Sequence, residues 1–364
     1  MGMLLRQAAG ILLAVAVVEA AQGGPRDPAA LAAAGWAAIE ERRFGDALEA
    51  FTRAAASSKS DPAVCAGAGL AAFMLGQNAE AQAWLERALT IAPQYVDASL
   101  LLGELHYRAG RVQDAIATYE AALEHAPGES VFEEKLGQWR KDVQLHAGFY
   151  ESRGAHFKVL FQGPADEMLA RRAVEMLEGA YWRVGAALTT YPARAITVVL
   201  YTQEQFRDIT RSPEWAAGAY DGTIRVPMRG ALERPDELER ILAHEFVHAV
   251  VATLGGRNVP VWLDEGLASM LEPREGTDEA VPARAGTRLP LTRLERGFAR
   301  LSAEEAQSAY AQSAVAVRKM VQLRGAPAVV TLLEDLGRGA SFGSAFYQRI
   351  AMRYEDFQTI VERE

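Results

Sequence analysis

Small and large apolar residues recur through the first half of the chain with a fixed step of 34 residues. Gly35, Gly69 and Gly103 follow this step, and Pro93 and Pro127 close the second and third units. The step also relates three further sets of positions: Ala47, Ala81 and Ala115; Ala54, Ala88 and Ala122; Phe51, Leu85 and Tyr119. This pattern predicts stacked pairs of helices, in which small residues permit close crossing and a proline ends each pair.

The period resembles that of the tetratricopeptide repeat, and the resemblance covers residues 28–128 as three repeats. Residues 129–149 follow as an expected capping helix, with Leu136, Trp139 and Val143 on its inner face. A repeat stack of this kind forms an α-helical solenoid with a concave surface. We therefore expect this surface to bind a protein partner; the alternative is that the stack only braces the rest of the chain.

From residue 150 to residue 364 the pattern changes to mixed strands and helices, which indicates an α+β domain. Alternation predicts a strand at 156–161, and a buried strand is expected at 196–201. The remaining expected elements are an amphipathic helix at 165–188, a short helix at 202–209, a strand at 219–227, and helices near 292–301, 304–323, 326–337, 341–351 and 354–363.

The helix expected after Pro235 carries the sequence HEFVH, with His244 and His248 one turn apart. Residues i and i+4 share one face of a helix, so both imidazoles can hold one metal ion. Glu245 lies between them and can reach a water on that ion without being a ligand. The surrounding residues are apolar, which predicts a buried helix: Ile241, Leu242, Phe246, Val247, Val250 and Val251. Buried ionisable groups need a partner, and we expect that partner to be Zn²⁺.

A catalytic zinc ion typically has three protein ligands and one open position. The other four histidines lie upstream of the HEFVH sequence, so the third ligand is expected to be Asp264 or Glu265. Both lie on a second short helix, which is expected to begin after Pro260. Cys65 is the only cysteine, which argues against a structural zinc site, because such sites favour cysteine ligands.

The HEFVH sequence, together with the PVWLDEGLA sequence from Pro260 to Ala268, resembles the gluzincin metallopeptidases and more closely the peptidase MA-like family. The resemblance implies a thermolysin-like domain over residues 150–364 that hydrolyses peptide bonds. It implies that Glu265 is the third zinc ligand, that Glu245 is the general base, and that Asp264 replaces the asparagine of gluzincins. Sixteen residues separate His248 from Glu265, a shorter gap than in aminopeptidase-type gluzincins.

Hydrolysis of a peptide bond also requires a group that stabilises the oxyanion of the transition state. The gluzincin pattern often supplies it from a later helix, which makes Tyr310 the candidate and Tyr220 the second choice. The resemblance also implies that the strand before the motif helix is an edge strand that aligns the substrate backbone. We assign this substrate-binding role to Gly222, Thr223, Ile224, Arg225 and Val226; an edge strand without a ligand is the alternative.

The composition of the chain excludes some classes of function, and its N-terminal segment indicates the cellular compartment. The net charge of −9 and the pI near 5.4 argue against nucleic-acid binding and against a basic membrane-binding surface. Residues 1–20 combine a basic start, an apolar run and a small-residue cleavage site, as in a signal peptide. We expect an exported protein, periplasmic or extracellular, without a stable membrane span; an uncleaved N-terminal helix is the alternative.

These patterns favour a zinc metallopeptidase that acts on a peptide or protein substrate. The main alternative is a catalytically silent, protease-like interaction scaffold that carries tetratricopeptide repeats. A third hypothesis is zinc-dependent hydrolysis of another amide or ester, because the chemistry of the metal does not select the acyl group.

Overall fold

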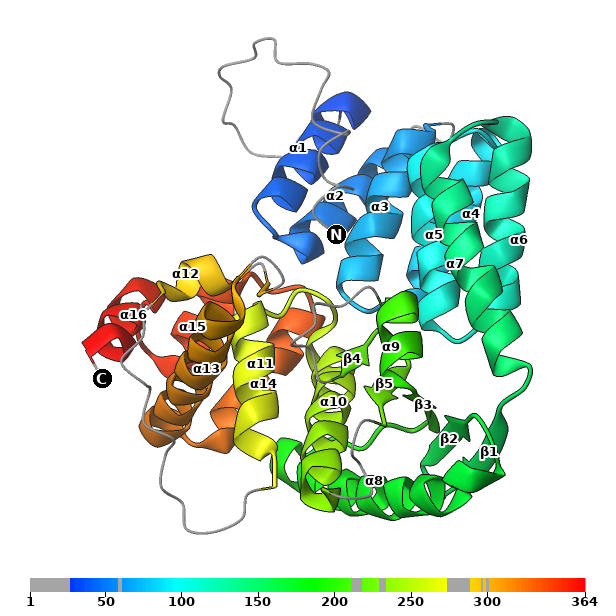
Figure 1. Ribbon diagram of the computed structural model, residues 1–364. Coiled ribbons are helices and arrows are strands. Elements are labelled where there is room, and N and C mark those ends of the chain that lie inside the picture. Colours follow the sequence, from blue (N-terminus) through cyan, green and yellow to red (C-terminus); the bar gives the residue numbers. More distant parts are fainter. Residues whose placement is uncertain are drawn as a thin grey trace.

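A computed structural model provides the structure, and it describes residues 27–57, 61–210, 218–228, 234–273, 289–295, 297–298 and 301–363. The signal peptide expected at residues 1–20 lies outside these residues. The N-terminal half is a row of helices, which packs against a mixed sheet and a lobe of helices formed by the C-terminal half (Figure 1). Within the described ranges, no helix combines the length and the apolarity that a membrane span requires.

The N-terminal helices pair as the 34-residue period predicts. They are α1 (Pro28–Glu40), α2 (Phe44–Ser57), α3 (Pro62–Met74), α4 (Asn78–Ile91), α5 (Val96–Arg108) and α6 (Val112–His125). A Cβ atom added to Gly69 would lie 2.6 Å from the side chain of Leu85, and one added to Gly103 would lie 2.2 Å from the ring of Tyr119. The periodic glycines therefore pack against the periodic large residues, and a side chain at the glycine position would clash. This contact explains why both sets recur with the same period.

Helix α7 (Ser130–His146) covers the end of the repeat stack, as expected for the capping segment. Leu136 and Trp139 are buried on its inner face. The Trp139 ring stacks on Tyr107 of α5 and contacts Tyr119 of α6, with centroid distances of 5.0 and 4.6 Å. The last repeat thus buries its apolar face against α7.

A mixed sheet begins the C-terminal half. Its strands are β1 (Tyr150–Arg153), β2 (Phe157–Phe161), β3 (Ile196–Tyr201), β4 (Ala219–Tyr220) and β5 (Ile224–Pro227). In the described part of the chain their order is β1-β2-β3-β5-β4, with β2, β3 and β5 parallel and the two outer strands antiparallel. Helix α8 (Glu167–Leu188) connects the parallel strands β2 and β3. Strand β1 was not anticipated by the alternation pattern.

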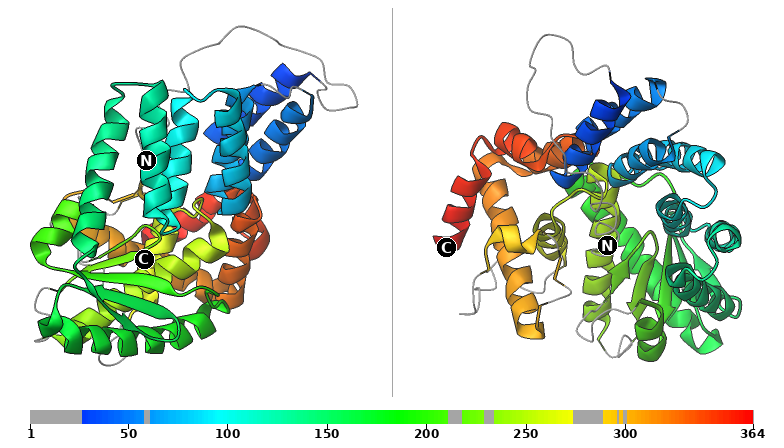
Figure 2. Two further views of the ribbon diagram at one scale, coloured as in Figure 1. Left: turned by 90° about the vertical axis from the view of Figure 1, so that its right-hand side faces the viewer. Right: turned by 90° about the horizontal axis from the view of Figure 1, so that it is seen from above.

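Strand β3 is buried on both faces, which explains its continuous apolar sequence. Val198 and Leu200 belong to the core beneath α8, whereas Val199 and Tyr201 pack with the short helix α9 (Gln203–Thr210) on the other face. The second face also lies near the end of α7, so the repeat half covers part of the sheet (Figure 2).

The strand that precedes the motif helix is not the edge that the sequence predicted. The segment 219–227 turns back on itself as β4 and β5, and β4 lies outside β5. Ala219 pairs with Arg225 and Tyr220 with Ile224. The edge position assigned to Gly222–Val226 is therefore wrong, and the two residues of β4 occupy it.

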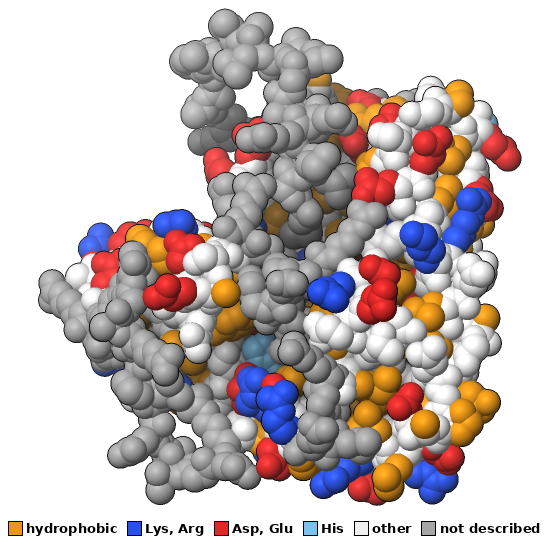
Figure 3. All heavy atoms as spheres, viewed as in Figure 1, with side chains coloured by type: hydrophobic (Ala, Val, Ile, Leu, Met, Phe, Trp, Pro, Cys, Tyr) orange, Lys and Arg blue, Asp and Glu red, His pale blue; other side chains and the backbone are white. Residues whose placement is uncertain are grey.

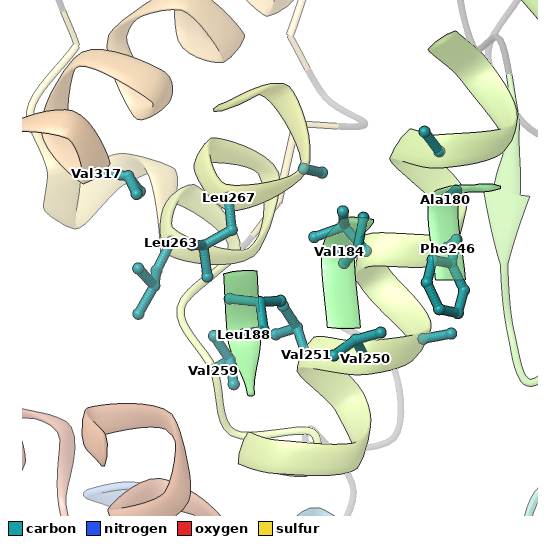
Figure 4. Close-up of a cluster of buried hydrophobic side chains, with 14 of the residues drawn as sticks. Ala180, Val184, Leu188, Phe246, Val250, Val251, Val259, Leu263, Leu267 and Val317 are labelled. Atoms are coloured by element: carbon teal, nitrogen blue, oxygen red, sulfur yellow. The ribbon is translucent and has the colours of Figure 1, made fainter. Parts of the chain in front are cut away.

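The motif helix α10 (Pro235–Gly255) and the following helix α11 (Val261–Leu271) form the centre of the largest core. Figure 4 shows Phe246 and Val250 of α10, Leu263 and Leu267 of α11, and Val184 of α8 in this core. The remaining helices are α12 (Leu291–Leu294), α13 (Ala303–Arg324), α14 (Ala326–Gly337), α15 (Phe342–Ile350) and α16 (Tyr354–Arg363). Four of the five expected helices are confirmed closely, whereas α12 is shorter than predicted.

The repeats contact the C-terminal half through the turns between paired helices. The Arg42 carbonyl accepts a hydrogen bond from Asn258 Nδ2 over 3.3 Å, and the Arg42 guanidinium donates one to the Asn258 carbonyl over the same distance. One repeat later, Gly76 has φ of +76°, and a Cβ added to it would lie 3.1 Å from the backbone of Gly256. The 34-residue period therefore places successive turns along one docking edge.

A buried ion pair joins the capping helix to the sheet. The Arg225 guanidinium on β5 donates a hydrogen bond to Asp142 of α7 over 3.3 Å, and the two side chains are 4% and 2% exposed. Arg225 also donates to the hydroxyls of Tyr201 and Tyr107 over 2.5 and 2.7 Å. Asp221 accepts a further hydrogen bond from Arg225 Nε over 3.3 Å. The buried cation thus has a partner on each side of the junction.

Replacing Asp142 with asparagine should destabilise the protein by about 3 kcal/mol, because the buried Arg225 charge loses one of its carboxylate partners. Urea unfolding followed by circular dichroism measures this change. The matched control is Glu120→Gln, which breaks the exposed Arg140–Glu120 pair and should cost about 0–1 kcal/mol. Equal losses for the two variants would contradict a structural role for the buried pair.

Candidate metal centre

Helices α10 and α11 bring three potential metal ligands to one point. Potential ligand atoms of His244, His248 and Glu265 all lie within 4.8 Å of one another. In the described part of the chain, these three residues are the cluster of His, Cys, Asp or Glu side chains that could hold a metal ion. Glu265 Oε2 is 3.3 Å from His244 Nε2 and 3.5 Å from His248 Nε2. Two imidazole nitrogens and a carboxylate oxygen are a donor set suited to catalytic zinc.

The outer ring nitrogens of both histidines are held by carboxylates. His248 Nδ1 is 2.8 Å from Asp264 Oδ1, and His244 Nδ1 is 2.7 Å from Glu272 Oε1. Glu272 is itself held by Arg240, whose guanidinium lies 3.2 Å away. These contacts fix each ring with Nε2 directed at Glu265, which is how metal-binding histidines are commonly oriented.

The residues left Asp264 and Glu265 as alternatives for the third ligand, and the resemblance put Asp264 at the position of the gluzincin asparagine. In the structure Glu265 joins the two histidines, whereas Asp264 contacts the outer nitrogen of His248. The sequence analysis did not predict Glu272. The signal that could have found it is spacing, because Glu272 lies seven residues after Glu265 and so near the same face of α11. Glu272 follows the last residue of that helix, where prediction from apolar periodicity ends.

The side chains of this group fit a divalent cation. Glu265 Oε2 is buried and makes no hydrogen bond. Burial opposes ionisation of Glu265, but the charge of His248 and contacts with His244 outweigh it and lower the pKa of Glu265 to about 2. Burial likewise disfavours a charged His244, but its close contacts with the Glu265 and Glu272 carboxylates raise its pKa to about 9. A buried anion between two imidazoles thus demands positive charge, which protons or a metal ion can supply.

Glu245 lies beside this group, in a confined position. Its side chain is buried, and burial raises the pKa of its carboxyl. The backbone of Gly218 passes directly over it, because a Cβ added to Gly218 would lie 2.4 Å from Glu245 Oε1. Both residues line the same cavity as the three ligands. Glu245 is therefore placed to exchange a proton with a molecule in that cavity.

Tyr310, the residue proposed from the sequence as the oxyanion donor, lies on α13 and lines the same cavity as His244, His248 and Glu265. Gly266 of α11 lets the two helices approach closely, because a Cβ added to it would lie 2.4 Å from the Ser313 carbonyl oxygen. The Tyr310 ring lies 6.2 Å from the His244 ring and 5.1 Å from the Phe298 ring, measured between centroids. Burial raises the pKa of Tyr310, so its hydroxyl stays protonated and can donate a hydrogen bond.

A cavity of about 700 Å³ connects these side chains with the repeat half. Figure 3 shows histidine surface at the floor of a hollow near the middle of the molecule. Its walls include the metal-site residues, the second-choice tyrosine Tyr220, and residues of the repeats: Leu75, Gly76, Asn78 and Arg108. The repeats therefore form part of the wall of this cavity.

The predicted substrate-binding segment reaches the cavity through one residue. Gly222 lines it, whereas Ile224, Arg225 and Val226 are buried within the sheet and at the junction with α7. Thr223 is half-buried, and its backbone N–H donates a hydrogen bond to Asp221. Any alignment of a substrate by β-addition would involve β4, which forms the edge of the sheet.

The carboxylates behind the histidines should tighten metal binding. Asp264→Asn and Glu272→Gln should each weaken zinc affinity by about 10–100-fold, because the acceptor that orients each ring loses its negative charge. Competition with a chromogenic chelator measures the change. Glu237→Gln, on the exposed first turn of α10, is the control and should leave the affinity unchanged. Unchanged affinity in both site variants would contradict this geometry.

Comparisons with known proteins identify the repeats. Models of the family described as tetratricopeptide repeat match residues 32–96 and 72–134. Among solved structures, the first such domain of Spaghetti (RPAP3), bound to an HSP90 peptide, is 18% identical, with a TM-score of 0.31; the match covers 32% of this chain and 96% of that one. The Arabidopsis OM64 domain is 20% identical, with a TM-score of 0.30 and coverages of 31% and 94%.

The first tetratricopeptide domain of human RPAP3 gives a similar result, with 19% identity, a TM-score of 0.31 and coverages of 33% and 95%. No curated protein matches the chain. The family models end at residue 134, before the sheet and the metal-site helices begin. Residues 32–134 are thus tetratricopeptide repeats, an α-helical solenoid of the kind that serves as a protein-interaction module.

Proposed function

We propose that the protein is a zinc metallopeptidase of the gluzincin type, related to the peptidase MA-like family. The observation that carries this proposal is the convergence of His244, His248 and Glu265 within 4.8 Å. It is supported by the position of Glu245 and Tyr310 on the wall of the same cavity. These groups correspond to the ligands, the base and the oxyanion donor that hydrolysis of an amide requires.

A bound zinc ion would polarise the substrate carbonyl and lower the pKa of a water molecule to roughly 7. In this proposal His244, His248 and Glu265 hold the ion, and Asp264 and Glu272 keep the two rings in place. Glu245 takes a proton from the attacking water and then delivers it to the leaving amine. The Tyr310 hydroxyl donates a hydrogen bond to the oxyanion, and burial keeps that hydroxyl protonated.

The repeats have a second role in this proposal, the binding of a protein partner on their concave surface. Membership of residues 32–134 in the tetratricopeptide family supports it. The alternative of a catalytically silent scaffold would keep this role and lose hydrolysis. The intact set of ligands and base argues against that alternative, whereas hydrolysis of a non-peptide amide or ester remains a second candidate chemistry for the same groups.

Glu245→Gln separates metal binding from hydrolysis. The substitution preserves the shape of the side chain but removes its basicity, so kcat on fluorescein-labelled casein should fall by about 10²–10⁴-fold. Zinc content, measured by mass spectrometry of metals, should stay at the wild-type value. Glu237→Gln on the same helix is the control and should retain activity. Wild-type protein that carries zinc but leaves casein and a set of simple esters intact would support the silent scaffold instead.

Tyr310→Phe tests the oxyanion role. Loss of the hydroxyl should lower kcat by about 10–100-fold with little change in KM, because the hydrogen bond forms in the transition state. Zinc affinity should be unchanged, since the ring still packs against Phe298. Tyr220→Phe is the matched comparison, because Tyr220 lines the same cavity from β4. A larger loss of kcat in Tyr220→Phe than in Tyr310→Phe would transfer the role to Tyr220.

A further inference from the structure

The cavity that contains the metal site carries two arginines at its repeat end. Arg108 is the last residue of α5, and Arg257 lies in the turn between α10 and α11. Both line the cavity together with His248 and Glu265. The two arginines thus come from different halves of the chain and line one cavity together with the proposed metal ligands.

Within the described part of the chain, the hydrogen-bond partners of Arg257 are neutral groups. Its guanidinium donates hydrogen bonds to the Phe73 carbonyl over 2.6 Å and to Asn78 Oδ1 over 3.1 Å, and it lies 4.0 Å from the centre of the Phe73 ring. Among the described residues, no carboxylate forms an ion pair with it. A half-buried guanidinium without an anionic partner has unused capacity to bind a carboxylate.

The acidic groups close to the two arginines are already engaged. Glu104 accepts a hydrogen bond from Arg108 over 2.7 Å and also lies 3.3 Å from Lys135 Nζ, so one carboxylate serves two cations. Asp221 lines the cavity too, but its carboxylate is bound by the buried Arg225. The repeat end of the cavity therefore keeps an excess of positive charge, although the whole chain has a net charge of −9.

The electrostatics of Arg257 agree with this charge excess. Burial, and after it the charge of Arg108, lower the pKa of Arg257 to about 10. The group is still protonated at neutral pH, so the two cations repel each other electrostatically across the junction. An anion between them would relieve the repulsion, and a planar carboxylate matches the two-pronged geometry of guanidinium.

We propose that Arg108 and Arg257 form a carboxylate subsite in the cleft, which binds an acidic side chain or the C-terminal carboxylate of a peptide. This inference rests on the proposed function, because it treats the cavity as a peptide-binding cleft. The repeats would then contribute directly to substrate selection through Arg108. Removal of the repeat half would leave the subsite incomplete.

Binding to the zinc-loaded, full-length Glu245→Gln protein tests the subsite without requiring turnover. Three decapeptides of alanine, leucine and serine, each carrying the same uncharged N-terminal dye, serve as probes: one amidated without any carboxylate, one amidated with two central glutamates, and one whose only carboxylate is its free C-terminus. Fluorescence anisotropy in about 150 mM salt reduces weak long-range attraction. We expect at least one carboxylate-bearing peptide to bind about tenfold more tightly than the uncharged amide. Which peptide shows the gain distinguishes a side-chain from a terminal carboxylate.

The same titrations on arginine variants show whether Arg108 and Arg257 cause the preference for carboxylate-bearing peptides. Arg108→Gln and Arg257→Gln should each reduce it to less than about threefold, because each removes one guanidinium. Arg257 also anchors the Phe73 carbonyl, so its variant can lose folding; Arg108→Gln breaks only the contact with Glu104 and keeps the test valid. Arg140→Gln, an exposed arginine on α7, is the matched control and should keep the preference.

Equal binding of the three peptides, no binding of any of them, or a preference that survives Arg108→Gln would overturn the subsite. These outcomes differ from failure of the proposed function. If an acidic peptide binds selectively but the zinc-loaded wild-type protein does not cleave it, the peptidase proposal fails and the subsite stands. If peptides are cleaved without regard to charge, the peptidase proposal stands and the subsite fails.

Discussion

The candidate site depends on one carboxylate, that of Glu265, which is buried between two imidazoles without a hydrogen bond to its inner oxygen. An isolated charge in such a place is costly, so positive charge must accompany it in the folded protein. This requirement constrains the position of α11 relative to α10, because Glu265 must lie next to both histidines. The loop that reverses the chain between them must be short and closely packed, and Gly256 provides the left-handed backbone conformation at its start, with φ of +66°.

That same loop is where the repeats attach. Arg257 donates its backbone N–H to the Met74 carbonyl over 2.7 Å, and Asn258 exchanges hydrogen bonds with Arg42. The tetratricopeptide repeats thus contact the chain at the point that sets the spacing of the two metal-site helices. Their concave surface stays available for a partner in our proposal, because the docking edge consists of the turns between paired helices. A solenoid can in this way serve both as a brace and as a wall of a cleft.

A second constraint comes from the sheet, one face of which packs against α8 and the motif helix while the other lies near α7 and α9. Strand β5 has side chains on both faces of the sheet. On the face toward α7 it carries Arg225, whose charge is paired with Asp142 of that helix. This contact fixes the sheet relative to the repeats independently of the turn contacts. Two separate attachments, one at the metal-site loop and one at the sheet, hold the two halves and so define the cavity between them.

Local sequence patterns were enough to predict the helical repeats, because a 34-residue period and the matching small and large positions depend only on local helix geometry. The same local geometry was enough to predict that His244 and His248 lie close together, and the sequence placed β3 and α10 close to their observed bounds. Other features arise from packing between distant segments, which no local pattern contains. This packing placed β4 outside β5, because strand order depends on pairing between distant segments, and it brought Glu272 behind His244 through the helix pair. It also placed Arg108 and Arg257, which are 149 positions apart in the sequence, on the wall of one cavity, since this depends on the docking of the two halves.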